Sequence, residues 1–326
     1  MAPRTFELQF GAGERARLHA LATLPDVVHV TEYHDLGPDE LAEIEVLITS
    51  WGAPRITPAL LDAMPTLRAI IHSAGSVRDL VPPQAYERGI QVSTAADMNA
   101  VPVAEYTLAA IIMAGKRALP LAARARRTSL GWGDGFAASD LSNLGRTVGL
   151  IGFSKIGRRV LRLLSVLETG PILVSDPLAD PAEVAAAGAE LVELEDLLGR
   201  CDIVSVHAPL LPSTQHMLGE RELGLMRPGA TLINTARGGL IDHDALVRHC
   251  SSERLDAILD VTDPEPLPPG HPLLALENVT VTPHVAGSLG TETRRLSRHA
   301  LDALEAYTTG APMPGAVVAE TSGVSA

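Results

Sequence analysis

Short apolar runs alternate with amphipathic stretches over the first hundred residues. Five of these runs have the length of strands, at residues 6–10, 27–31, 46–49, 68–72 and 90–93. Between them, residues 13–24 and 57–63 show helical spacing, and Pro58 suits a first helical turn. The alternation predicts a small parallel α/β domain.

The pattern changes near Asn99. Residues 99–127 are rich in Ala, Leu, Ile and Met and predict one long, largely buried helix, and residues 128–143 predict a loop. A second α/β run follows, with strands predicted at residues 147–151, 172–175, 202–206, 231–234, 256–261 and 279–282. Strands this apolar are typical of a parallel sheet covered on both faces. We therefore expect a doubly wound domain, then a helix over residues 291–307 and a frayed tail.

Composition narrows the class of protein. The 326 residues are long enough for two sizeable cores, and 46% hydrophobic with 20% charged residues is ordinary for a folded chain. Cys201 and Cys250 are too few for a disulfide framework, which favours a reducing cytoplasm. We find no secretory signal and no apolar run of roughly 18 residues, so we expect a cytoplasmic protein with no membrane partner.

The charge argues against nucleic acid as a partner. With 26 basic and 39 acidic residues, the formal net charge of -13 repels a phosphate backbone. The densest basic cluster comprises Lys116, Arg117, Arg124, Arg126 and Arg127. We interpret it as the polar face of the long helix.

A glycine motif links the first strand of the second run to its helix. Gly152 allows a sharp turn and Gly157 allows close packing of helix on sheet, while the helix amino terminus offers N–H groups to a pyrophosphate. Lys155 and Ile156 open that helix. The middle glycine of the motif is replaced by Ser154, whose hydroxyl could donate a hydrogen bond to the phosphates instead.

Asp176 strengthens the case for a dinucleotide. It ends the next predicted strand about 20 residues after Gly157, where a carboxylate takes both ribose hydroxyls. Pro177 and Leu178 follow, and no arginine, so NAD is favoured over NADP. The alternative is a structural turn in which Asp176 caps a helix; the strand context favours the dinucleotide.

Three later segments supply candidate chemistry: residues 234–239, 260–266 and 282–288. They contain a fixed cation, a carboxylate and an imidazole. These are the groups needed to hold an acid anion, polarise its 2-oxo group and deliver a proton.

With the glycine motif and residues 206–214, these segments resemble the D-isomer-specific 2-hydroxyacid dehydrogenases, which include glycerate, phosphoglycerate, glyoxylate and D-lactate enzymes. The resemblance runs from about residue 99 to 287. It implies a Rossmann-type doubly wound domain, residues 99–289, inserted into a smaller flavodoxin-like α/β substrate domain formed by residues 1–98 and 290–326. It also implies an active site in the cleft between domains, and a homodimer formed through the long helix.

By position in this family, three residues carry the reaction. Arg237 matches the arginine that clamps the substrate carboxylate, and Glu265 matches the carboxylate that stabilises a protonated imidazole. His284 matches the acid/base that protonates the 2-oxo oxygen as hydride arrives from the nicotinamide. Asp263 is a competing carboxylate that, with Pro264, could simply form a turn; family position favours Glu265.

The remaining cofactor contacts expected are His207, Pro209, Thr214, Thr235, Ala236, Asp260 and Thr107. His207 is expected to pack or hydrogen-bond near the adenosine. No metal is assigned, because the side chains of residues 242–244 diverge on a helix and Asp242 suits an N-cap.

The substrate is expected to contact residues near the amino end. By the resemblance, backbone N–H groups of residues 73–76, which include Ala74, Gly75 and Ser76, receive the substrate carboxylate. Arg78 could add a second anion contact, but an ion pair with Asp79 is favoured. Trp51 is equally well interpreted as a wall of the pocket or as a packing residue on the domain face.

These observations predict an NAD-dependent oxidoreductase that interconverts a 2-oxo acid and a D-2-hydroxy acid. One alternative is a non-enzymatic dinucleotide sensor of corepressor type with the same fold. Another is a formate dehydrogenase-type enzyme, which is disfavoured because pairing Glu265 with His284 suits proton transfer, a step that formate oxidation does not need. The sequence leaves the acid itself open.

Overall fold

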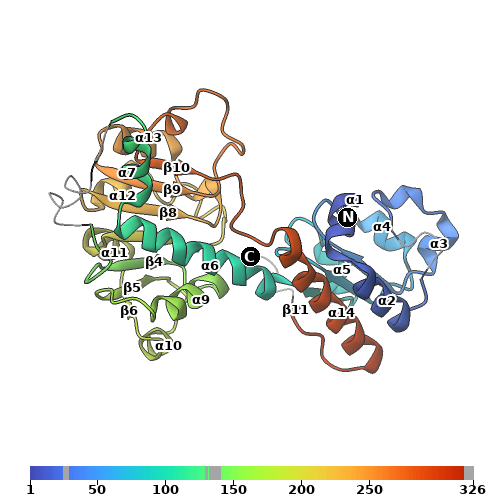
Figure 1. Cartoon of the computed structure of the whole chain (residues 1–326). Helices are drawn as coiled ribbons and strands as arrows, with labels where there is room; N and C mark the ends of the chain where they lie inside the picture. The colour runs from blue at the N-terminus through green and yellow to red at the C-terminus, as the bar shows by residue number, and fades with distance from the viewer. Residues whose placement is uncertain (25–28, 129–130, 132–140, 319–326) are drawn as a thin grey trace. The chain divides into compact units, whose positions relative to one another are not determined.

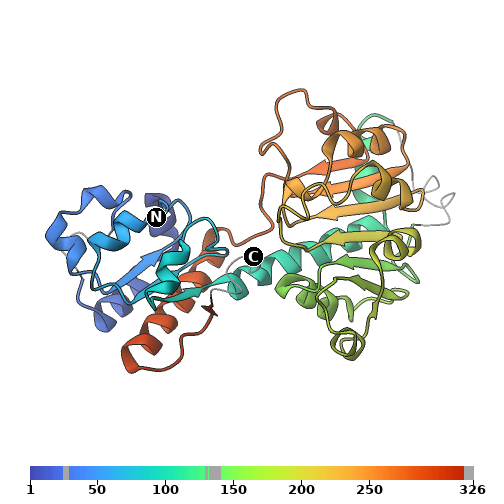
Figure 2. The same cartoon turned by 180° about the vertical axis from the view of Figure 1, so that it is seen from behind.

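The computed structural model describes residues 1–24, 29–128, 131 and 141–318. The chain divides into two compact units: unit 1 comprises Met1–Ala100 with Ser288–Ala326, and unit 2 comprises Val101–Gly287. The amino-terminal (blue) and carboxy-terminal (red) segments therefore belong to the same unit, as Figures 1 and 2 show. Unit 2 is inserted into unit 1 in sequence.

The sheet of unit 2 has seven strands in the order β10-β9-β8-β7-β4-β5-β6, and all neighbours are parallel. The strands are β4 (Val148–Ile151), β5 (Ile172–Ser175), β6 (Glu190–Leu191), β7 (Ile203–Val206), β8 (Ala230–Asn234), β9 (Leu255–Leu259) and β10 (Val279–Val281). The order reverses between β4 and β7. In a doubly wound sheet, ligands bind at the carboxyl ends of strands beside such a reversal.

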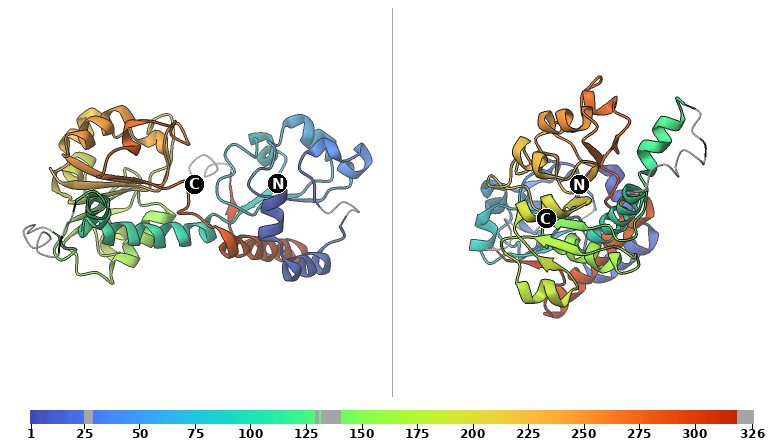
Figure 3. Two further views of the ribbon diagram at one scale, coloured as in Figure 1. Left: turned by 45° about the horizontal axis from the view of Figure 1, so that its top comes forward. Right: turned by 90° about the vertical axis from the view of Figure 1, so that its left-hand side faces the viewer.

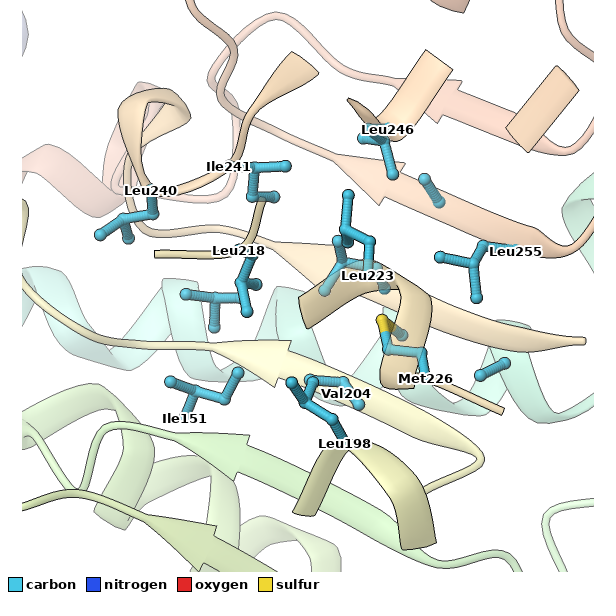
Figure 4. Close-up of a cluster of buried hydrophobic side chains, with 14 of the residues drawn as sticks. Ile151, Leu198, Val204, Leu218, Leu223, Met226, Leu240, Ile241, Leu246 and Leu255 are labelled. Carbon is cyan, nitrogen blue, oxygen red and sulfur yellow. The ribbon is translucent and has the colours of Figure 1, made fainter. Parts of the chain in front are cut away.

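Helices cover both faces of this sheet (Figure 3). They are α6 (Ala96–Gly115), which begins in unit 1, α7 (Ala118–Ala125), α9 (Lys155–Leu164), α10 (Pro181–Ala186), α11 (Leu194–Arg200), α12 (Glu220–Leu225) and α13 (His243–Ser251), with 3-10 turns η2 (Gly238–Leu240) and η3 (Pro272–Leu274). Because side chains alternate along a strand, Val204 of β7 joins the cluster under α11 to α13 (Figure 4), as does Val206. Ile203 joins the cluster under α6 and α9.

The long helix predicted over residues 99–127 is wrong, because two helices occupy that segment. Arg117, between α6 and α7, adopts a left-handed conformation with φ 44°. Its Nε and Nη2 lie 2.8 and 3.0 Å from the two carboxylate oxygens of Asp256, whose side chain is 4% exposed. Arg124 and Arg127 lie 3.9 and 3.2 Å from the carboxylate of Glu277. Three of the five basic residues thus pair with acidic residues of unit 2. The one that departs from helical geometry, Arg117, pairs with a buried carboxylate.

By length and hydropathy alone, α6 qualifies as a membrane-crossing helix, the only one to do so in the part of the chain that the structure describes. Half of its most apolar window is nevertheless buried inside the protein. Asp97 and Glu105 interrupt the apolar run within the helix. Packing against the core of unit 2 therefore accounts for the buried half of this apolar window.

Unit 1 is built on a four-stranded sheet in the order β1-β2-β3-β11, with β11 antiparallel to β3 and the other pairs parallel. The strands are β1 (Val46–Thr49), β2 (Ala69–His72), β3 (Gln91–Thr94) and β11 (Ala316–Val317). One face packs against α1 (Pro3–Gln9), α2 (Ala12–Leu21) and α14 (Thr293–Thr309), and the other against α3 (Pro38–Ala42), α4 (Pro58–Ala63) and α5 (Pro83–Glu87). Two 3-10 turns, η1 (Tyr33–Asp35) and η4 (Gly290–Glu292), complete the unit.

The first predicted strand, residues 6–10, is wrong: it belongs to α1 and the residue that caps it. Phe6 and Phe10 are four residues apart and stack with ring centroids 5.4 Å apart, which is the contact of one helix face. Pro3 stands in the first turn, where its missing N–H costs nothing. Part of the next predicted strand, residues 27–31, lies outside the described residues.

The predicted frayed tail is also wrong as far as it is described. The edge of β3 leaves backbone groups to be paired, and Thr94 donates its N–H to the carbonyl of Gly315 at 2.9 Å. Ser93 donates its hydroxyl to the carbonyl of Pro314 at 2.6 Å, and Val317 is buried. Residues 319–326, and most of the loop predicted at 128–143, lie outside the described residues.

The other predicted strands are confirmed within two residues at each end, and the helix predicted at 291–307 is α14.

Candidate active site

The glycine turn of unit 2 lies at the reversal of strand order, between β4 and α9. Gly152 has φ 100°, and a Cβ there would lie 2.8 Å from the backbone nitrogen of Ala208 in the loop after β7. A Cβ at Gly157 would lie 2.2 Å from the carbonyl oxygen of Gly152. Both positions therefore require glycine, since any side chain would separate α9 from the strand ends.

Ser154 caps α9 in place of the expected glycine. Its Oγ accepts a hydrogen bond from the N–H of Gly157 at 3.3 Å, and Lys155 and Ile156 follow as the first residues of the helix. The serine thus satisfies one N–H of the helix terminus and keeps its hydroxyl proton, for which the described residues provide no acceptor.

Asp176 lies directly beside the same turn. One carboxylate oxygen accepts from the N–H of Phe153 at 2.7 Å, and the other from the N–H of Leu178 at 2.9 Å. The two bonds hold the carboxylate at the carboxyl end of β5, next to the glycine turn.

His207 follows β7 and is packed against the glycine turn. Its backbone N–H donates to the carbonyl of Ile151 at 2.7 Å, and the residue is 4% exposed. Burial lowers the pKa of His207 to about 3, so the ring is neutral. Neither ring nitrogen has a hydrogen-bond partner within the described part of the chain. Buried polar groups normally have a hydrogen-bond partner, so an unpaired imidazole beside a glycine turn is consistent with a ligand-binding site.

Two predicted cofactor residues shape the loop after β7. The hydroxyl of Thr214 donates to the carbonyl of Pro209 at 2.6 Å and accepts from the N–H of Leu211 at 2.8 Å. These bonds fold residues 209–214 back on themselves.

The turn after β8 is held by a buried asparagine. The amide of Asn234 donates to the carbonyl of Arg237 at 2.9 Å and accepts from the N–H of Ala236 at 3.0 Å. The hydroxyl of Thr235 lies 3.0 Å from that of Thr107 on α6, which donates to the carbonyl of Val103. Asn234 opens the segment 234–239, in which the sequence assigned it no role; an Asn at a strand end that starts a turn is the signal that could have identified it.

Arg237 is exposed at the carboxyl end of β8, where its Nη1 donates to the carbonyl of Ala236 at 2.6 Å. Gly238 lets this turn pack against the loop after β9, because a Cβ there would lie 2.0 Å from the carbonyl carbon of Thr262. The turn that carries Arg237 is therefore packed directly against the loop after β9.

Asp260 holds the loop that carries His284. Its side chain accepts hydrogen bonds from the N–H groups of Val285 and Ala286 at 2.8 and 2.9 Å and from the hydroxyl of Thr282 at 2.6 Å. The residue is 1% exposed. Three donors compensate a carboxylate that is almost fully buried.

His284 and Glu265 form an ion pair in this loop region. Nδ1 of His284 lies 2.6 Å from Oε1 of Glu265, and the side chains are 51% and 42% exposed. The backbone N–H of His284 lies 2.9 Å from the carbonyl of Asp260, with φ 54°. The carboxylate in contact is that of Glu265 and not that of Asp263. Nε2 has no partner among the described residues, so it is the nitrogen left to exchange a proton.

A hollow of about 490 Å³ opens beside this pair. Its walls come from the ends of β9 and β10 and the loops after them, and they combine the two ionisable groups with apolar side chains: Glu265, His284, Pro266, Leu267, Leu274 and Val281. The arrangement places the ion pair of His284 and Glu265 against a partly apolar wall.

In unit 1, the loop after β2 exposes unused backbone donors. Ala74, Gly75 and Ser76 have N–H groups with no acceptor in the described ranges. Successive N–H groups of this kind form an anion-binding concavity. Asp79 forms an ion pair with Arg55 at 2.9 Å, a partner that the sequence did not indicate.

Trp51 follows β1 in the same unit and is 38% exposed, and its carbonyl accepts from the N–H of Ala2 at 3.1 Å. Asp242 caps α13 through the N–H of Ala245 at 3.0 Å, as the sequence predicted.

Residues 108–286 match the family model described as the D-isomer specific 2-hydroxyacid dehydrogenase, NAD binding domain. The chain belongs to this family. The match confirms the resemblance found in the sequence, the Rossmann-type α/β fold and NAD as the cofactor of the family's nucleotide domain.

Relatives in the 2-hydroxyacid dehydrogenase family cover most of the chain. A glyoxylate reductase from Thermofilum pendens is 33% identical over 268 residues, which are 81% of this chain and 78% of the relative. A D-3-phosphoglycerate dehydrogenase from Methanocaldococcus jannaschii is 33% identical over 276 residues; these are 82% of this chain but only 51% of the relative, so the chain spans about half of that enzyme. The crystal structure of a phosphoglycerate oxidoreductase from Rhizobium etli has a TM-score of 0.80 at 29% identity and covers 97% of this chain and 95% of its own.

Proposed function

We propose that this protein is an NAD-dependent oxidoreductase that interconverts a 2-oxo acid and a D-2-hydroxy acid. The observation that carries the proposal is the contact of 2.6 Å between Nδ1 of His284 and Oε1 of Glu265, on a loop held by the buried carboxylate of Asp260. Bound NADH supplies the hydride for reduction of the 2-oxo carbon. His284 donates a proton from Nε2 to the 2-oxo oxygen, and Glu265 stabilises the imidazolium through Nδ1. In the oxidative direction, neutral Nε2 accepts the hydroxyl proton.

The residues of the glycine turn fit the nucleotide. Gly152 and Gly157 keep the backbone bare where a diphosphate would approach, and the amino terminus of α9 at Ser154, Lys155 and Ile156 would hold it. Asp176 would accept the ribose hydroxyls, since its four lone-pair sites exceed the two backbone donors it already has. His207 would provide an unpaired ring nitrogen on the same side.

The other proposed cofactor residues act mainly by fixing loops. Pro209 and Thr214 fold the loop after β7, and Thr107 and Thr235 join α6 to the end of β8. Ala236 and Asp260 lie on turns whose backbone is fixed by hydrogen bonds.

Two groups are proposed to bind the substrate carboxylate. In unit 2, the guanidinium of Arg237 offers paired donors to a carboxylate and to a 2-oxo oxygen. In unit 1, the N–H groups of Ala74, Gly75 and Ser76 offer a neutral concavity for an anion. Trp51 is proposed to border the substrate side chain. We propose that unit 1 is the substrate domain and unit 2 the nucleotide domain.

The test is a panel of 2-oxo acids, including glyoxylate and hydroxypyruvate, assayed with NADH and with NADPH. We expect reduction to the D-2-hydroxy acid with NADH preferred. His284→Asn should lower kcat about 10³-fold, because a positioned general acid contributes about 10²–10⁴-fold. His216→Asn is the matched control: His216 is another exposed histidine of unit 2 with positive φ, at 51°, and its replacement should leave kcat unchanged.

Other outcomes of the panel would overturn parts of the proposal. Binding of NADH without turnover of any 2-oxo acid would favour the dinucleotide sensor. Oxidation of formate with no reduction of 2-oxo acids would favour a formate dehydrogenase-type enzyme. A clear preference for NADPH would contradict the role of Asp176.

We propose further that two copies associate through α6. Half of the most apolar window of this helix is not buried within one chain, and Met113 on it is 46% exposed. Light scattering should give twice the 34.3 kDa chain mass. Met113→Glu should shift the protein toward the monomer; a monomeric wild-type protein would refute the association.

A further inference from the structure

A buried network of polar side chains in unit 1 hydrogen-bonds to the backbone at the start of the loop after β2. Gln9, at the end of α1, donates from Nε2 to the hydroxyl of Ser50 at 2.9 Å and to the carbonyl of Ser73 at 3.0 Å. The hydroxyl of Ser50 donates to the same carbonyl at 2.9 Å. All three residues are at most 1% exposed. Two donors from different elements therefore converge on one backbone oxygen.

The orientation of the Gln9 amide is decided by its partner. The carbonyl of Ser73 can only accept, so the atom that faces it must be the amide nitrogen. The main chain of Gln9 is also anchored, because the buried hydroxyl of Ser297 on α14 donates to the Gln9 carbonyl at 2.5 Å. Side chain and backbone of Gln9 are thus both held in place.

Holding the Ser73 carbonyl sets the direction of the N–H groups that follow it. A trans peptide is planar, so its N–H points away from its C=O. With the Ser73 oxygen held by Gln9 and Ser50, the N–H of Ala74 must point to the opposite side. The next peptide is set in the same way, since the carbonyl of Ala74 accepts from the N–H of Ala95 at 2.9 Å. The N–H of Gly75 is thereby directed as well.

The network is a poor device for stability alone. Oε1 of Gln9 and Oγ of Ser73 are buried without a hydrogen-bond partner among the described residues. A buried polar atom without a partner is destabilising, and a leucine on this helix face would avoid that loss at Gln9. What the glutamine provides and a leucine lacks is a pair of N–H donors aimed at the Ser50 hydroxyl and the Ser73 carbonyl.

We infer that Gln9 is a positioning residue for binding of the substrate carboxylate. It keeps the N–H of Ala74 oriented toward the anion before the anion arrives, beside the N–H of Gly75 that Ala95 directs, and it contributes no atom to the contact. Preorganised donors bind an anion more tightly because no reorientation is needed on binding. The inference rests on the proposed function, in which these N–H groups receive the carboxylate of a 2-oxo acid.

The kinetic test uses Gln9→Leu, which keeps the volume and removes both donors. We expect the KM for glyoxylate to rise about tenfold with kcat within about twofold, because the carboxylate is bound alike in ground and transition states. The dissociation constant of NADH should not change. Leu18→Ala is the control: it removes a buried side chain from the α2–α14 core of the same unit, so it lowers stability without touching the network. An equal rise of KM in Leu18→Ala would reduce Gln9 to a structural role.

A second variant tests whether the two donors act together. Ser50→Ala removes the other donor to the Ser73 carbonyl. Because the Ser50 hydroxyl is itself oriented by Gln9, the double variant should raise KM no more than about twofold beyond Gln9→Leu, so the effects are not additive. Additive effects would mean that the two residues act independently.

A third measurement does not depend on activity. Amide NMR signals and hydrogen exchange of Ala74, Gly75 and Ser76 are compared between the wild-type protein and Gln9→Leu in the absence of substrate. We expect shifted signals and faster exchange in the variant, with Leu18→Ala unchanged at these residues. Unchanged signals would overturn the inference. If the wild-type protein reduces no 2-oxo acid, the proposed function fails, and this measurement still decides whether Gln9 orients the loop.

Discussion

Glu265 and Asp263 lie two residues apart, yet only Glu265 contacts His284. We predict that Glu265→Gln lowers kcat/KM for reduction about tenfold or more near pH 8, because a neutral amide no longer stabilises the imidazolium. The pH above which reduction declines should move to lower pH. Steady-state rates between pH 5 and 9 measure both effects.

Asp263→Asn is the matched control for that prediction. It removes a carboxylate from the same turn without touching the ion pair, so its pH profile should follow that of the wild-type protein. If Glu265→Gln left the profile unchanged as well, the ion pair would have no part in proton transfer.

At the residue scale, the sequence could predict functional residues whose contacts lie close by in the chain. Gly152, Gly157 and Asp176 belong to one strand–turn–helix unit, and their contacts follow from its geometry. Gln9 could not be found in this way, because its partners, Ser50 and Ser73, come from distant parts of the chain. In the sequence, Gln9 is one polar residue in a run that resembled a strand.

At the scale of elements, the break between α6 and α7 depends on one ion pair. Burial raises the pKa of Asp256, and Arg117 is the base that compensates its charge. We predict that Arg117→Met lowers the free energy of unfolding of unit 2 by about 2 kcal/mol, less than for a fully buried pair because Arg117 is partly exposed. Calorimetry should show a Tm lower by about 4–8 °C.

Arg124→Met provides the comparison, since Arg124 lies 3.9 Å from its carboxylates and is half exposed. Its effect should stay within about 0.5 kcal/mol. Equal losses in the two variants would show that Asp256 is not the cause.

The elements that the sequence misassigned share a physical reason. Residues 6–10 offer too few apolar positions to separate a period of two from a helical face, and the stacking of Phe6 on Phe10 decides for the helix. Strand β11 has only two residues and exists because β3 has a free edge. The central strands of unit 2, β4, β7, β8 and β9, were predicted well because each is buried along its whole length and therefore reads as a continuous apolar run. The two-residue edge strand β6 is more exposed and was not predicted.

At the scale of the whole molecule, each unit contains a buried neutral histidine. Burial, with a smaller effect of the positive amino terminus, lowers the pKa of His72 in unit 1 to about 4. Burial lowers the pKa of His207 in unit 2 to about 3. An unfolded histidine has a pKa near 6.5, so between about pH 6.5 and 4 the unfolded chain binds protons that the folded chain does not. Stability is therefore lost as the pH falls, by about 1.4 kcal/mol per pH unit for each histidine.

Calorimetry at pH 7 and pH 5 tests this directly. Between pH 7 and pH 5, both units of the wild-type protein should lose stability. The loss in unit 1 should be smaller in His72→Gln, and the loss in unit 2 should be smaller in His207→Gln. His34→Gln, at an exposed histidine, should behave like the wild-type protein. Parallel losses in all four proteins would show that other groups govern the acid response.

The left-handed backbone of His284 constrains which sequences can survive there once catalysis is no longer selected. At φ 54° a β-branched side chain is strained, and glycine, asparagine and aspartate are tolerated best. A saturation library sorted only for protein abundance should therefore enrich these three residues over valine and isoleucine. Relatives that abandoned the reaction would be expected to carry the same small set. The position would then still mark the old active site after its chemistry had disappeared.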